Sequence, residues 1–106
     1  MTSTTPPETA ADDAAAGQVH ALPEMLDLAQ AESLRKGMLN LLQRRDILLD
    51  ASAVQRMSTP CVQILLAAGR SAQAVQKPYK ITNASDVFRA AIADLGLQSE
   101  FSNWMN

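Results

Sequence analysis

The 106-residue sequence contains little of the material from which most catalytic and metal-binding sites are built. One histidine, His20, and one cysteine, Cys61, provide neither a ligand cluster for a metal ion nor a pair for an internal disulfide. Neither belongs to a recognisable pattern of nucleophile and base, so we interpret His20 as structural and Cys61 as inert packing. Four glycines without a cluster argue against a glycine-rich phosphate loop. We therefore expect no metal, no cofactor and no enzymatic activity.

An excess of positive charge is also missing. Nine Lys and Arg residues against eleven Asp and Glu residues give a net charge of -2, and no basic stretch is interleaved with aromatic residues. Proteins that bind nucleic acid usually present such a basic surface. We therefore expect no nucleic-acid partner.

Long apolar runs are absent as well. Stretches such as residues 64–69 are far shorter than the roughly 20 apolar residues that cross a bilayer. The first residues also lack the basic and apolar regions of a secretory signal. We expect a cytoplasmic protein that does not insert directly into a membrane.

The composition divides the chain into a tail and one domain. Residues 1–17 consist mostly of Thr, Ser, Pro, Ala and acidic residues, with almost nothing large enough to bury. The remaining residues carry the apolar side chains of a modest core, and a chain of this length has room for one domain only. We therefore predict a disordered tail over residues 1–17 and a single domain over residues 18–106.

Strand-like and helix-like segments alternate through this domain. Short apolar runs predict strands, whereas apolar residues at helical spacing predict amphipathic helices. Pro23 cannot donate to a sheet ladder, so it suits the end of a strand or an edge strand. The alternation is typical of an α/β fold, with a mainly parallel or mixed sheet of about four strands and three to four helices. The predicted strands are residues 19–22, 46–50 and 79–82, and the predicted helices are residues 29–42, 59–75 and 85–95.

The middle predicted strand is apolar between two aspartates, a pattern typical of a central strand that is covered on both faces. Asp46 and Asp50 are interpreted as solvated strand ends that take part in turn hydrogen bonds. In the helix that follows, Gly69 and its neighbouring alanines predict a close approach to a sheet.

The ends of two helices are marked by residues with special backbone preferences. Thr59 is the predicted N-cap of the second helix, with Pro60 in the first helical position, where its missing N–H costs nothing. Ser85 is the predicted N-cap of the last helix, and Gly96 is the residue expected to end it.

The turn before the second helix is the strongest candidate for a functional site. It follows the carboxyl end of the middle strand, where α/β sheets usually place their functional loops. A phosphate on a hydroxyl at a helix start would meet free N–H groups and the positive end of the helix dipole. Thr59 is therefore a candidate switch. The alternative is that Thr59 only caps the helix and that Ser58 is a solvated turn residue.

Residues 50–62, with the sequence DASAVQRMSTPCV, resemble the signature of STAS domains, the fold of bacterial anti-sigma factor antagonists. The family pattern reads Asp-Leu-Ser-x-Val-x-x-Met-Asp-Ser-Ser-Gly-Leu. The segments 26–28 and 85–101 are also similar to the family, so the resemblance covers about residues 18–104. The matching signature residues are Asp50, Ser52, Val54 and Met57.

In STAS domains the first Ser of the turn, sometimes a Thr, is phosphorylated by a partner kinase, and Thr59 occupies this position. The family's Asp, second Ser and Gly are replaced by Ser58, Pro60 and Cys61. The resemblance implies a non-enzymatic interaction module with Thr59 and Ser58 as phosphorylation candidates. The implied partner-binding residues are Met57, Ser58, Thr59, Pro60 and Cys61.

The resemblance also implies a class of partner. Residues 58–63 are similar to the stand-alone STAS proteins of alphaproteobacterial chemotaxis systems. The implied partner is a histidine-kinase-like ATPase, an anti-sigma-like kinase or a chemotaxis protein, in chemotaxis or in anti-sigma-type partner switching. The alternative is a structural subunit of a phospholipid-transport ATPase complex, because STAS proteins with a Thr in the same turn occur there.

Overall fold

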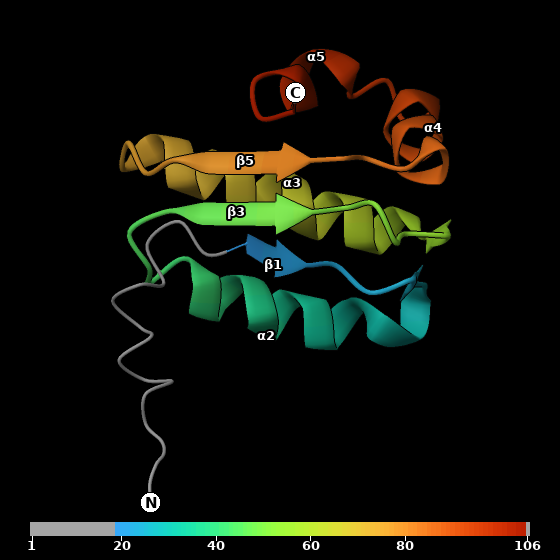
Figure 1. The fold of residues 1–106 in the computed structure, drawn as a ribbon, viewed down its shortest axis with the longest axis horizontal. Coiled ribbons are helices and arrows are strands. Elements are labelled where there is room, and N and C mark those ends of the chain that lie inside the picture. The colour runs from blue at the N-terminus through green and yellow to red at the C-terminus, as the bar shows by residue number, and fades with distance from the viewer. Residues whose placement is uncertain (1–18, 106) are drawn as a thin grey trace, which may run out of the picture.

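The computed structural model describes residues 19–105, so the predicted tail over residues 1–17 lies outside the described part. At its centre is a parallel sheet in the order β1-β3-β5 (Figure 1). Its strands are β1 (Val19–Ala21), β3 (Ile47–Asp50) and β5 (Tyr79–Thr82). The predicted parallel sheet is confirmed, and β1, which ends just before Pro23, is an edge strand.

Helices connect these strands and follow the last of them. A short 3-10 helix η1 (Leu28–Gln30) continues into α2 (Ala31–Leu41), and α3 (Thr59–Ala74) leads from the second strand toward the third. Two helices, α4 (Asp86–Asp94) and the five-residue α5 (Gln98–Ser102), come after β5. Together with the sheet, they confirm the predicted α/β fold.

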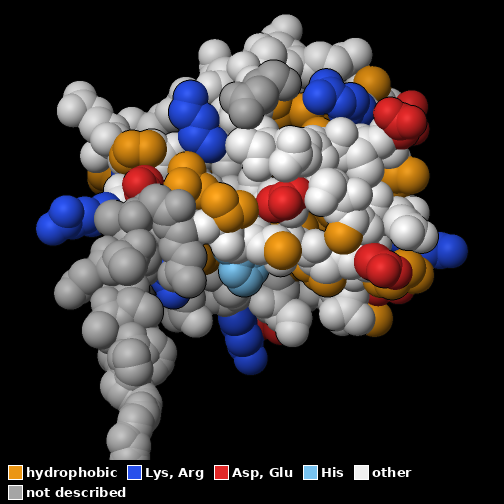
Figure 2. Space-filling view, viewed as in Figure 1, with side chains coloured by type: hydrophobic (Ala, Val, Ile, Leu, Met, Phe, Trp, Pro, Cys, Tyr) orange, Lys and Arg blue, Asp and Glu red, His pale blue; other side chains and the backbone are white. Residues whose placement is uncertain are grey.

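The helices α2 and α3 cover one face of the sheet, and Figure 1 shows β3 and β5 in front of α3. Ile47 and Leu49 of β3 point into the core beneath these helices, whereas Leu48 and Asp50 are only half-buried. The expectation that β3 is covered on both faces is therefore wrong for the described residues. The strand order runs in one direction, so both right-handed crossovers place their helices on the same side. Figure 2, viewed as in Figure 1 with the sheet in front of α3, shows hydrophobic side chains scattered among charged and polar ones.

A second, two-stranded sheet was not predicted from the sequence. Its strands, β2 (Met25–Leu26) and β4 (Arg56–Met57), are parallel and pair Leu26 with Met57. Two residues are too few to show any apolar periodicity. This small sheet matters for function because it fixes the chain immediately before the predicted turn.

The predicted ends of α4 are confirmed. The Ser85 hydroxyl accepts a hydrogen bond from the Phe88 N–H (3.1 Å) and donates one to the carbonyl of Val54 (2.7 Å). Gly96 follows the helix with a φ of 70°, and its N–H bonds to the Ala93 carbonyl. This left-handed position is the one that glycine adopts without a steric penalty.

Gly69 allows a close approach, although its neighbour is not a sheet. A Cβ at this position would lie 2.6 Å from the indole ring of Trp104. The chain at Trp104 runs beside β5, because the Ile81 N–H donates to the Trp104 carbonyl (2.8 Å) and Ile81 bridges to Met105. The residues around Trp104 therefore cover the outer edge of β5, and the indole ring packs directly against Gly69.

Candidate functional site

The loop from β3 to the predicted turn is shaped by hydrogen bonds at both of its ends. At the start, the Asp50 carboxylate accepts a bond from the Ser52 N–H (2.9 Å), which lowers the pKa of Asp50. At the end, the Gln55 N–H donates to the Glu24 carbonyl (2.7 Å), and the Ser58 N–H donates to the Leu26 carbonyl (2.8 Å). The turn at residues 57–60 is therefore held in place by residues 24–26, which lie 31 and 32 positions before their partners in the chain.

The helix after this turn begins one residue earlier than predicted. Its first intrahelical bond runs from the Val62 N–H to the Ser58 carbonyl (3.1 Å), which makes Ser58 the N-cap. Ser58 has an extended backbone (φ -92°, ψ 158°), because its N–H donates to the Leu26 carbonyl and continues the pairing of β4 with β2. Thr59 is thus the first helical residue and Pro60 the second. The prediction of Thr59 as the N-cap is wrong.

Ser58 caps the helix with its backbone alone. Its hydroxyl makes no side-chain cap bond, and its oxygen is buried without a partner among the described residues. A solvated hydroxyl was one of the two interpretations of this residue, and that interpretation is wrong. A kinase could not reach the Ser58 oxygen in this conformation.

The other predicted partner-binding residues differ widely in exposure. Thr59 and Pro60 are exposed, and Met57 is half-buried. The Thr59 hydroxyl forms no hydrogen bond with the residues that the structure describes. Cys61 is 0% exposed, and its thiol donates to the carbonyl of Asp27 (3.5 Å). The Cys61 side chain therefore packs beneath the turn and cannot touch a partner directly.

A groove runs beside the turn, between the start of α3 and the side of α4. Its volume is about 300 Å³. Met57, Thr59 and Val62 line one wall, and residues of α4 line the other. The α4 wall includes Val87 and Leu95, which are 40% and 38% exposed. The groove therefore joins the predicted turn to an apolar surface on α4.

Sequence reasoning missed the contribution of α4. The sequence predicts an amphipathic helix at residues 85–95, and within α4 only Phe88 and Ile92 are buried. Six of the nine residues of α4 are apolar when alanine is counted, which is more than one buried face needs, and this excess was the available signal. Val87 and Leu95 lie on the margin of the stripe and face the groove.

The charge of this groove comes from a single side chain among the described residues that line it. Asp94 of α4 is the only charged residue among them, and it lines the same groove as Thr59. His20 is exposed on β1, on another element from this groove. Within residues 19–105 no group of three or more His, Cys, Asp or Glu residues could hold a metal ion. The arrangement is suited to binding an apolar segment.

None of the helices in the described part of the chain is long and apolar enough to cross a membrane. The parallel sheet with helices on one face and the exposed strand-to-helix turn define an α/β interaction domain of the STAS type. A family model described as "Mlab, STAS domain" matches residues 10–101, most of the chain, and the chain belongs to this family. No curated protein matches the chain. Membership of the STAS family supports a general role for this chain as a protein-interaction module of the anti-sigma-antagonist type.

Proposed function

We propose that this domain docks a protein partner through the turn at residues 57–60 and the groove beside α4, and that phosphorylation of Thr59 switches the contact. The observation that carries this proposal is the position of Thr59. Its exposed hydroxyl, without a hydrogen-bond partner among the described residues, lies on the wall of an apolar groove at the start of a sixteen-residue helix.

Thr59 is a better acceptor for a phosphate than Ser58. A kinase needs a hydroxyl that reaches solvent, and the Ser58 oxygen is buried. A phosphate on Thr59 would add about -1.5 to -2 charge beside the positive end of the α3 dipole. Pro60 carries no N–H, so the first turn of α3 offers fewer donors to neutralise that charge. Much of the new charge would therefore face the partner.

The same phosphate would change the groove itself. Asp94 is the only charge among the described residues that line it, so phosphorylation would change the charge of the groove from -1 to about -2.5 to -3. An apolar partner segment seated there would have to be desolvated next to this charge, which costs binding free energy. The unphosphorylated domain is therefore the form that holds the partner in this proposal.

The proposed partner is a histidine-kinase-like ATPase, an anti-sigma-like kinase or a chemotaxis protein in the cytoplasm. A domain without catalytic machinery of its own acts in such a pathway by being bound or released. The alternative is a structural subunit of a phospholipid-transport ATPase. That subunit would stay bound whatever the state of Thr59, so the two functions differ in their response to charge at this residue.

Copurification of the tagged full chain from its own cells, with mass spectrometry of the captured proteins, tests the proposed face. Leu95→Asp places a charge on the exposed wall of the groove and should remove the specific partner. Val75→Asp is the matched control, because Val75 is 65% exposed and lies at the other end of α3. Equal capture by both variants would show that the partner does not use this groove.

A further inference from the structure

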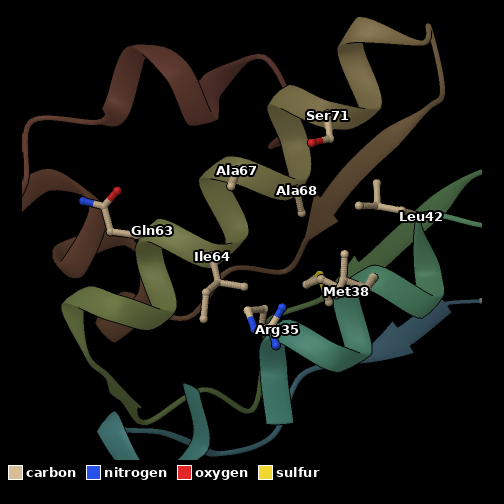
Figure 3. Close-up of a pocket in the computed structure, with 9 residues that line it drawn as sticks. Arg35, Met38, Leu42, Gln63, Ile64, Ala67, Ala68 and Ser71 are labelled. Carbon is tan, nitrogen blue, oxygen red and sulfur yellow. The ribbon is translucent and has the colours of Figure 1, made fainter. Parts of the chain in front are cut away.

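We draw no further inference here: the strongest candidate, the apolar groove of about 260 Å³ between α2 and α3 (Figure 3), carries nothing because Arg35, the one charged residue among the described residues that line it, is already paired with Glu32 (2.8 Å) and nothing in the structure shows what covers it.

Discussion

The hydroxyl of Tyr79 donates a hydrogen bond to the carbonyl of Leu65 (2.8 Å), which ties β5 to the middle of α3 inside the core. Tyr79 also packs edge-to-face against Trp104, with ring centroids 5.1 Å apart. The carbonyl partner can only accept, so the tyrosine must stay protonated to keep the bond.

The burial of Tyr79 predicts a loss of stability in alkali. Burial raises the pKa of Tyr79 above its ordinary value. The unfolded chain releases this proton near pH 10, so stability is intact below pH 10 and falls as the pH rises, by about 1.4 kcal/mol per unit. Tyr79→Phe should cost about 1 kcal/mol at pH 7 and reduce the alkaline fall. Urea unfolding from pH 8 to pH 11 measures both, and an equal fall in the two proteins would contradict the prediction.

Two helical glycines should respond in opposite directions to replacement by alanine. Gly69→Ala should destabilise the domain, because the new Cβ meets the Trp104 ring at 2.6 Å and the indole must shift. Gly37→Ala should stabilise it by about 0.5–1 kcal/mol, because alanine favours a helix and nothing lies within 4 Å of its Cβ. Thermal unfolding with tryptophan fluorescence measures both changes. Stabilisation by Gly69→Ala would contradict the prediction and show that the Trp104 ring can move aside without cost.

Two N-cap serines should differ in what their hydroxyls contribute. Ser85→Ala should cost about 1–2 kcal/mol, because that hydroxyl bonds both Phe88 and Val54. Ser58→Ala should change stability by less than about 0.5 kcal/mol, because the buried Ser58 oxygen has no partner among the described residues. Chemical denaturation of the two variants compares them directly. A cost for Ser58→Ala as large as that for Ser85→Ala would mean that the Ser58 hydroxyl is bonded after all.

The ends of α3 and α4 allow another paired prediction. Both helices are followed by a residue in the left-handed region, Gln76 (φ 58°) after α3 and Gly96 (φ 70°) after α4. The N–H of Gln76 bonds to Gln73, as that of Gly96 bonds to Ala93. Gln76→Gly should raise the free energy of unfolding by about 0.5–1 kcal/mol, and Gly96→Ala should lower it by a similar amount. A lower free energy of unfolding for Gln76→Gly, or a higher one for Gly96→Ala, measured by urea unfolding, would contradict this account of the helix ends.

Features of this fold that depend on neighbouring residues could be predicted from the sequence. The strand over residues 79–82 has the predicted bounds, and the Ser85 cap and the Gly96 stop are as expected. Each of these rests on side chains and backbone preferences within one turn of the chain. The alternation of short apolar runs and helical stripes was enough to indicate the α/β fold.

Features that depend on distant contacts could not be predicted in the same way. The N-cap falls on Ser58 because its N–H is taken by Leu26, which lies on a strand of only two residues. The reason for a glycine at position 69 is the indole of Trp104, thirty-five positions later. The groove beside the turn needs α4 to pack next to the start of α3. The position of the turn could therefore be predicted from the sequence, whereas the second wall of the groove, on α4, could not, because it depends on tertiary packing.

The switch at Thr59 is tested most directly by the affinity of the copurified partner for Thr59→Asp and Thr59→Asn, measured by calorimetry at fixed salt. The two side chains have nearly the same shape, and Ser58 supplies the cap in both, so the pair differs essentially in one charge. The account predicts that Thr59→Asn binds within about threefold of the original chain, and that Thr59→Asp binds at least about tenfold more weakly than Thr59→Asn. Equal dissociation constants for the Asp and Asn variants would contradict the switch and favour a partner that stays bound regardless of Thr59.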